Sequence, residues 1–540
     1  GHSQARGEQS GVRSRPEFTL HDLLYNSVAR DPQKAAVVDG DAKYTYEDLE
    51  RQSGSLGAAL AEAGVGRGDR VGVYLEKSWE AIVAMLAASR IGAAYVNVNP
   101  LFKAPQVKYL ADDCDIRVMI GDSPKLGELQ PKTVETAFYR GAKPEGPAAS
   151  SYVDVAEALE GEGLKEDRKV SESDLGTILY TSGSTGMPKG VATSQRNVVV
   201  GAQIVSEYLE NTPEDRILSA LPLNFDAGMS QFTTSLRASA TLYLLRSRLP
   251  GDLLKALRRH EITGVTGVPP LWALLIRGAR SIRENPLTHL RCLANTGGRI
   301  PQANLDELRD LLEPAGTRIF LMYGLTEAFR STYLAPEEIH RSSPEQGNCI
   351  GKAIPNTEIM VITREGKEAA PGEPGELVHR GPTVAMGYWG NEEATRKAYR
   401  PNPLAPPELL DVERVVYSGD TVERDEEGYL YFLGREDAMI KNQGYRLSPE
   451  EVENLLLGSG LVHEACAFGV ENPAVGQDVI VVISLRNGSE EGALDRVREY
   501  AINNGPPYMV PKEILVRDEL PKTGSGKIDR KGISSAYSNG

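Results

Sequence analysis

The stretch that decides the fold is Tyr180-Thr181-Ser182-Gly183-Ser184-Thr185-Gly186-Met187-Pro188-Lys189-Gly190-Val191. It follows an apolar, strand-like run and combines glycines, four serine or threonine residues and one lysine. In such a loop, backbone N–H groups and hydroxyls can turn toward phosphate oxygens while the lysine adds positive charge. The loop has neither the P-loop spacing nor the GxGxxG pattern. It therefore predicts a phosphate-binding loop of another kind.

The chain on both sides of this loop alternates apolar strand-like runs with amphipathic helical stretches. Short Val/Ile/Leu runs at 264–268, 291–296 and 318–323 are typical of buried parallel strands. After Gly351 the pattern changes to β segments punctuated by glycine and proline, which indicates an antiparallel sheet or barrel. We expect an α/β protein. Its large N-terminal domain, residues 17–434, would combine parallel-sheet α/β subdomains with a β-barrel-like subdomain, and residues 435–540 would form a small α+β domain.

Length and charge limit the classes of function. A chain of 540 residues predicts several compact units. With 60 Lys and Arg against 75 Asp and Glu, the net charge of −15 disfavours nucleic-acid binding. The apolar run near the N-terminus at 81–88 is far shorter than the roughly 20 residues that span a bilayer. We therefore expect a cytoplasmic protein with small-molecule or protein partners and no membrane association.

Five further motifs follow the loop along the chain. They are Tyr323-Gly324-Leu325-Thr326-Glu327, Tyr417-Ser418-Gly419-Asp420, Gly434-Arg435-Glu436-Asp437, Ile440-Lys441-Asn442-Gln443-Gly444-Tyr445-Arg446-Leu447 with Glu450 and Glu453, and Pro521-Lys522-Thr523-Gly524-Ser525-Gly526-Lys527-Ile528-Asp529-Arg530. Together with the loop they resemble, in order, the motifs of the adenylate-forming (AMP-binding) superfamily. The resemblance covers residues 18–531.

The resemblance implies a reaction in two steps. A carboxylate attacks the α-phosphate of ATP to give acyl-AMP and pyrophosphate, and a thiol then displaces AMP. The implied catalytic residues are Lys527, Thr326, Glu327 and Lys189, with Glu327 also contacting Mg²⁺. The implied nucleotide-binding residues are Thr181, Ser182, Gly183, Ser184, Thr185, Gly186, Tyr323, Gly324, Asp420 and Arg435. Asp437 would be the hinge of a mobile C-terminal domain, whose rotation brings Lys441 and Gly444 to the thiol tunnel.

The acyl pocket begins at Pro222-Leu223-Asn224-Phe225-Asp226-Ala227-Gly228-Met229-Ser230-Gln231, which resembles the FDxS segment of amino-acid adenylation domains. There the aspartate pairs with the substrate ammonium, because a carboxylate in an apolar pocket needs a cation. Alternatively, Asp226 caps a helix that begins near Ala227. The same resemblance places in the pocket Ser230, Val268, Ala294, Thr296, Met322, Arg330 and Ser331. Arg330 would pair there with Asp226 or with a second carboxylate, or would lie outside as a solvated arginine.

Several pocket positions carry small residues, which favours a small acyl group. Residues 324–333 and 351–358 resemble exosortase-associated acyl-CoA ligases and stand-alone prolyl-adenylating enzymes. We therefore predict an AMP-forming carboxylate–thiol ligase that uses ATP and Mg²⁺, activates a small amino acid, L-proline first, and loads the phosphopantetheine thiol of a separate carrier protein. The alternative is an AMP-forming acyl-CoA ligase for a non-amino carboxylic acid.

Overall fold

The computed structural model describes residues 14–102, 104–129, 134–146, 149–181, 188–247, 249–435, 439–442, 445–447, 449–472, 475–486, 491–505 and 507–540. The chain forms two compact units, each built from separated segments. The first comprises Gly1–Ile178, Thr193–Ile217 and Met229–Leu244, and the second comprises Leu179–Ala192, Leu218–Gly228 and Leu245–Gly540. The predicted boundary between 434 and 435 stays a prediction. No helix in the described ranges is both long and apolar enough to cross a bilayer.

The first unit contains a parallel sheet with helices between its strands. Its strands pair in the order β4 (Ala94–Asn97), β3 (Arg70–Tyr74), β5 (Val118–Asp122), β6 (Thr136–Arg140) and β7 (Ser151–Asp154). Helix α3 (Trp79–Arg90), which connects β3 to β4, is buried at every position except Glu80. A helix that is apolar on all sides is stable only in such an interior. Strands β3 and β4 and helix α3 thus form a β-α-β unit, as the alternation of strand-like and helical stretches in the sequence predicts.

The other elements of this unit are strands at one end of the 14-stranded sheet and further helices. Strand β1 (Ala35–Asp39) pairs with β2 (Ala42–Thr45) and with β11 (Thr241–Leu244). The helices are α1 (Leu20–Arg30), α2 (Tyr46–Glu62), α4 (Ala104–Asp113), α5 (Ser123–Glu128), α6 (Val155–Leu159) and α7 (Gln195–Tyr208). Elements with residues in both units are β8 (Leu175–Thr181), β9 (Lys189–Ser194), β10 (Arg216–Ser219) and α8 (Asp226–Ala238).

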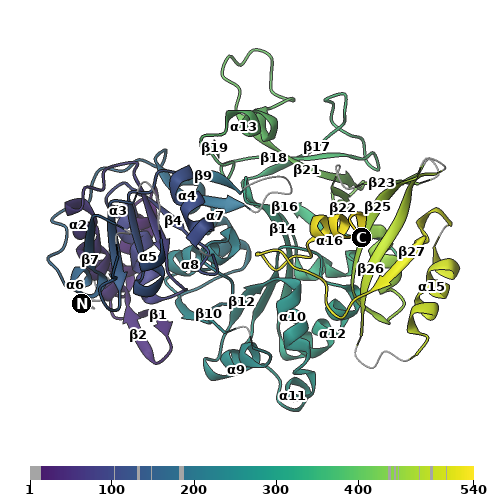
Figure 1. Cartoon of the computed structure of the whole chain (residues 1–540), viewed down its shortest axis with the longest axis horizontal. Helices are drawn as coiled ribbons and strands as arrows, with labels where there is room; N and C mark the ends of the chain where they lie inside the picture. The colour runs from purple at the N-terminus through teal and green to yellow at the C-terminus, as the bar shows by residue number, and fades with distance from the viewer. Residues whose placement is uncertain are drawn as a thin grey trace, which may run out of the picture. The chain divides into compact units, whose positions relative to one another are not determined.

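The second unit is organised around a strand that changes the direction of pairing. Strands β12 (Gly264–Gly267), β13 (Cys292–Asn295) and β14 (Arg318–Leu325) are parallel, whereas β15 (Phe329–Leu334) runs antiparallel to β14. The sheet continues with antiparallel strands β16 (Cys349–Ala353), β22 (Leu430–Arg435), β21 (Arg414–Arg424), β18 (Gly375–Arg380) and β17 (Glu358–Ile362) (Figure 1). The change from parallel to antiparallel pairing, predicted after Gly351, therefore occurs earlier in the chain, between β14 and β15.

Shorter elements surround this sheet. Helix α10 (Pro269–Ile276) packs on one face, where the Trp272 indole donates to Asn295 Oδ1 at 2.9 Å. The others are α9 (Asp252–Arg259), α11 (Ala279–Glu284), α12 (Gln302–Leu312), β19 (Gly387–Tyr388), α13 (Glu392–Ala398), β20 (Tyr399–Pro401) and the 3-10 turns Glu313–Ala315 and Pro336–Arg341.

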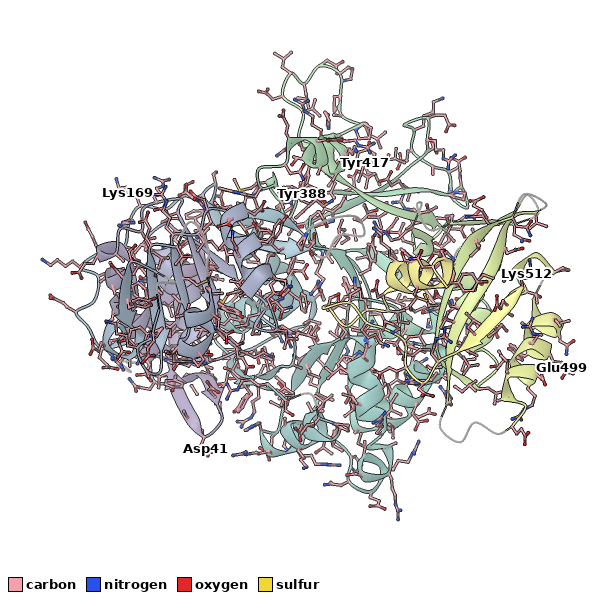
Figure 2. All side chains as sticks on the ribbon, in the orientation of Figure 1. Asp41, Lys169, Tyr388, Tyr417, Glu499 and Lys512 are labelled. Atoms are coloured by element: carbon pink, nitrogen blue, oxygen red, sulfur yellow. The ribbon has the colours of Figure 1, made fainter. Side chains whose placement is uncertain are left out.

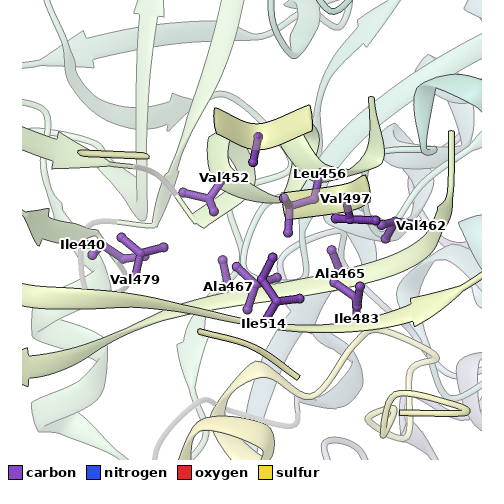
Figure 3. Close-up of a cluster of buried hydrophobic side chains, with 12 residues drawn as sticks. Ile440, Val452, Leu456, Val462, Ala465, Ala467, Val479, Ile483, Val497 and Ile514 are labelled. Atoms are coloured by element: carbon purple, nitrogen blue, oxygen red, sulfur yellow. The ribbon is translucent and has the colours of Figure 1, made fainter. Parts of the chain in front are cut away.

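The C-terminal part has its own sheet with a core on each face. Strands β25 (Val462–Asn472) and β26 (Gly476–Leu485) form a long hairpin, and β27 (Glu513–Val516) pairs in parallel with β26. Alternate residues such as Ala467 and Val481 face α14 (Pro449–Leu457) and α15 (Ala493–Asn504) (Figure 3), and the intervening residues face α16 (Arg530–Ser538). Short strands β23 (Ile440–Asn442) and β24 (Tyr445–Leu447) and the 3-10 turn Pro507–Met509 complete it. Successive side chains point to opposite faces, and both faces carry a core, so the apolar runs in β25 and β26 are continuous.

Alanine substitutions at two glycines, one inside β16 and one outside it, test how tightly this strand is packed. Gly351 and Gly366 both have positive φ, +85° and +79°. A Cβ atom on Gly351 would lie 2.0 Å from the Tyr333 carbonyl oxygen, whereas one on Gly366 meets nothing within 4 Å. Gly366→Ala should lower the free energy of unfolding by about 1–2 kcal/mol through its φ angle alone. Gly351→Ala should lower it further, because the backbone of β15 must also move. Urea unfolding followed by circular dichroism would contradict this packing if both midpoints shifted equally.

Candidate active site

Four predicted pocket residues, Ala294 and three others, share one face of the β12–β13–β14 sheet. Thr266 lies beside Ala294, and Ala294 beside Phe320, in the parallel register. Side chains alternate along a strand, so the residues two positions further lie on the same face. These residues are Val268, Thr296 and Met322. The ladder extends to this level, because the Thr296 N–H donates to the Gly267 carbonyl at 2.9 Å.

The hairpin between β14 and β15 adds Arg330 to this face. Arg330 is paired with Gly324, which is two residues beyond Met322, after a register shift between Tyr323 and Gly324 that skips Ser331. A Cβ atom on Gly324 would lie 2.3 Å from the Phe329 carbonyl oxygen, so the position accepts only glycine. Arg330 is 3% exposed. The alternative that places it in solvent is therefore wrong.

Lys527 reaches the same strand ends from the C-terminal loop. The Thr523 N–H donates to the Lys527 carbonyl at 2.7 Å and closes this loop. The Lys527 Cε atom lies 3.7 Å from the position of a Cβ on Gly297, and Val268 Cγ1 lies 3.0 Å from that same position. The absence of a side chain at Gly297 thus leaves room for Lys527 beside Val268.

Glu327 and Lys189 come together around a tyrosine that sequence reasoning missed. Tyr388, labelled in Figure 2, donates from its hydroxyl to Glu327 Oε1 at 2.8 Å. The Lys189 ammonium lies 4.8 Å from the centroid of the Tyr388 ring. Burial, followed by the Glu327 carboxylate, raises the pKa of Tyr388, so the phenol keeps its proton. The one sequence signal for Tyr388 is an aromatic pair between Gly387 and Gly390.

Tyr323 and Arg435 both contact Asp420. Asp420 on β21 is buried and lies across from Arg435 on β22, with 3.2 Å between Oδ1 and Nη1. The Tyr323 hydroxyl donates to Oδ2. Burial and the neighbouring carboxylate raise the pKa of Tyr323 well above its usual value. Gly419, at φ +73°, would place a Cβ 3.3 Å from Arg435 Nη2, so glycine leaves space for this guanidinium.

Asp226 is the first residue of α8. A carboxylate in the first turn interacts favourably with the helix dipole, so Asp226 stabilises this helix whatever its other role. Gly228 lets the helix begin close to the preceding loop, because a Cβ there would lie 1.8 Å from the Pro222 carbonyl oxygen. Ser230, one turn further, is buried and belongs to the first unit.

The predicted phosphate loop follows a strand, as expected. Thr181 ends β8, and its hydroxyl donates to the carbonyl of Lys189, the first residue of β9, at 3.5 Å. Thr326 lies in the turn between β14 and β15. Ser182, Gly183, Ser184, Thr185, Gly186, Asp437 and Gly444 lie outside the described residues, and Lys441 is described only by its backbone in β23.

The two glutamates of the motif at 440–453 lie in a charged network, in which Glu453 is buried and Glu450 is half-buried. Glu453 Oε1 accepts from the Ala467 N–H at 3.1 Å and from the Arg530 guanidinium. Asn348 Nδ2 donates to Glu450 Oε2 at 3.3 Å. Burial and the Glu453 carboxylate raise the pKa of Glu450 to about 7, against opposing effects of Arg530 and Arg299. Sequence reasoning missed Asn348 and Arg299, because neither lies in a motif.

Comparison with known proteins identifies the family. Residues 24–389 match the AMP-binding enzyme family, and residues 451–527 match the AMP-binding enzyme C-terminal domain. The chain belongs to the AMP-binding enzyme family. The family and the fold class expected from the sequence are confirmed.

Among its relatives is the L-proline:L-prolyl-carrier protein ligase of Pseudomonas fluorescens, 30% identical over 95% of this chain and 98% of that protein. Gramicidin S synthase 2 of Brevibacillus brevis is 29% identical over 95% of this chain, which spans only 11% of that synthase. The o-succinylbenzoate CoA synthetase from Bacillus subtilis, solved with ATP and magnesium ion, has a TM-score of 0.78 and 26% identity over 95% of this chain and 99% of that one.

The Glu450 carboxyl group makes stability depend on pH. In the folded state its pKa is about 7, against a usual value of 4.5, so between these values the folded chain holds a proton that the unfolded chain releases. The contribution of Glu450 to the free energy of unfolding is therefore complete below pH 4.5 and is lost as the pH rises through 7. Glu450→Gln should change less in stability from pH 5 to 8 than the wild type does.

Urea unfolding at four pH values within this range measures the difference. Glu499→Gln is the matched control, since it removes an exposed glutamate of the same C-terminal part and should keep the wild-type slope. Parallel curves for the wild type and Glu450→Gln would refute the assignment of the slope to this group.

Proposed function

We propose that the chain adenylates a small amino acid with ATP and transfers the aminoacyl group to the phosphopantetheine thiol of a separate carrier protein. A carboxylate oxygen of the amino acid attacks the α-phosphorus, the bond to the bridging oxygen breaks, and pyrophosphate leaves. The thiolate sulfur then attacks the acyl carbon, and AMP leaves. The observation that carries the proposal is the position of Lys527 beside Val268 and Gly297, at the ends of the strands that carry the pocket residues.

Charged residues of the second unit are suited to bind the ribose and the phosphates of ATP. Asp420, which contacts Tyr323 and Arg435, is suited to accept hydrogen bonds from the ribose hydroxyls. Lys189 and the loop after Thr181 supply positive charge and donors for phosphate oxygens. Lys527 stabilises charge that develops on the α-phosphate and on the attacking carboxylate.

Glu327 is the carboxylate that would hold Mg²⁺. Across the described ranges, no group of three or more His, Cys, Asp or Glu side chains could hold a metal ion. Mg²⁺ is commonly bound by one or two carboxylates together with substrate phosphates. A carboxylate that accepts a hydrogen bond from neutral Tyr388 fits this role. When bound, the ion would neutralise negative charge on the phosphates.

The substrate assignment rests on Asp226 and on a relative. Asp226 lies in the segment that resembles the ammonium-binding segment of amino-acid adenylation domains. The prolyl ligase of Pseudomonas fluorescens is similar to this chain over nearly its whole length, which makes L-proline the first substrate to test. Likeness to o-succinylbenzoate CoA synthetase favours the second candidate, an acyl-CoA ligase for an acid without an amino group.

Between the two steps, we expect residues 435–540 to rotate relative to residues 17–434 about Asp437. The rotation would withdraw Lys527 and bring Lys441 and Gly444 beside the path of the thiol. Such a step is a gating motion of the kind that often limits turnover.

Lys527→Ala separates the two steps. It should reduce adenylate formation about 100-fold or more, the scale of losing one electrostatic contact to the transition state. It should leave thioester formation from supplied aminoacyl-AMP near the wild-type rate. Lys512→Ala is the control, because Lys512 is mostly exposed and pairs with Asp478 at 2.9 Å. Equal loss of both steps would disprove the alternation of Lys527.

ATP–pyrophosphate exchange over a panel of amino acids and their deaminated analogues tests the substrate assignment. Exchange should need the amino group. Asp226→Asn should raise KM for the amino acid by roughly tenfold or more, because a charge-assisted contact is lost. Asp252→Asn, which removes a first-turn carboxylate from α9, should not change KM. Exchange with deaminated acids at the same rate would favour the acyl-CoA ligase instead.

A further inference from the structure

Arg330 is a buried cation for which the described part of the chain supplies no counter-charge. Its side chain is 3% exposed, and its Nε atom is buried without a hydrogen-bond partner. The guanidinium lies 5.1 Å from the centroid of the Phe329 ring, and no hydrogen bond or ion pair joins it to another described residue. A buried charge without an anion is strongly destabilising. A ligand that brings an anion would remove this penalty.

The position of Arg330 points to the acyl substrate as that ligand. Arg330 is paired with Gly324, which lies on the same face of β14 as Met322, and a register shift between Tyr323 and Gly324 skips Ser331 in β15. Phe329, the residue before it, has φ +68°, a strained conformation for an aromatic residue that is typical of functional sites.

The surroundings of Arg330 match a single negative charge. The adjacent Ser331 hydroxyl lies 2.8 Å from His379 Nδ1, and His379 Nε2 lies 3.1 Å from the Thr383 hydroxyl. Burial lowers the pKa of His379 to about 3, so the imidazole is neutral and adds no positive charge. A planar carboxylate, with one charge and two oxygens, matches the fork of a guanidinium.

We propose that Arg330 binds a second carboxylate of the substrate, so that the amino acid activated here is an acidic one. The proposal rests on the proposed adenylation of an amino acid and makes its substrate class specific. In the described part of the chain, Asp226 and Arg330 do not pair with each other. We therefore assign Asp226 to the substrate ammonium group and Arg330 to the second carboxylate. The hydrocarbon ring of L-proline would leave Arg330 without a counter-charge.

ATP–pyrophosphate exchange by the wild-type enzyme tests this with L-aspartate, L-glutamate, their amides L-asparagine and L-glutamine, and L-proline. The better acidic amino acid should exceed its amide by at least about tenfold in kcat/KM. Arg330→Gln should abolish this preference, and Arg330→Lys should restore part of it. Arg280→Gln removes a guanidinium that is 93% exposed and should keep the wild-type preference. Circular dichroism and the unfolding midpoint check that each variant folds.

The outcomes separate this inference from the proposed function. Exchange with L-proline that is insensitive to Arg330→Gln would overturn the inference and leave amino-acid adenylation standing. Equal exchange with acids and amides would also overturn it. Exchange with succinate or glutarate that depends on Arg330 would support carboxylate binding by Arg330. It would overturn the proposal that the substrate is an amino acid. Because the wild-type panel alone decides the acid preference, a variant that fails to fold does not prevent the test.

Discussion

The hydrogen-bond ladder that joins β12, β13, β14 and β15 is the constraint on which the candidate active site depends. Side chains alternate between the two faces of a strand, so a slip of one residue would move Met322 and Thr296 to the opposite face. In the hairpin the register shifts by one residue between Tyr323 and Gly324, which skips Ser331 and sets Arg330 across from Gly324. The face that carries these residues therefore depends on strand register and on the register shift in this hairpin.

Two buried carboxylates of the second unit have hydrogen-bonding partners. Asp420 has Arg435 and Tyr323, and Glu453 has Arg530 and a backbone N–H. These contacts also position groups that a nucleotide would use. Arg330 breaks this pattern, because it is equally buried and pairs with no anion among the residues that the structure describes. A protein tolerates such a charge when binding, and not folding alone, supplies the missing contact.

The family of the chain and its substrate are decided by different residues. The motifs that suit phosphate and ribose are spread over the second unit, and relatives named for carrier proteins and for CoA share the chain almost end to end. Similarity to these relatives therefore indicates use of a nucleotide and does not identify the acyl substrate. We expect the acyl side to depend on a few positions on one sheet face, where one charged residue such as Arg330 can alter the substrate class.

Local sequence was sufficient for the order and kind of the elements. The apolar runs predicted at 264–268, 291–296 and 318–323 became β12, β13 and β14, and the loop after Tyr180 follows a strand, because periodicity and turn residues act over a few positions. Local sequence could not show that Arg330 is buried, that Tyr388 contacts Glu327, or that Asn348 meets Glu450. Each of these depends on which distant segments lie side by side, and only the paired strands and packed helices of the folded chain decide that.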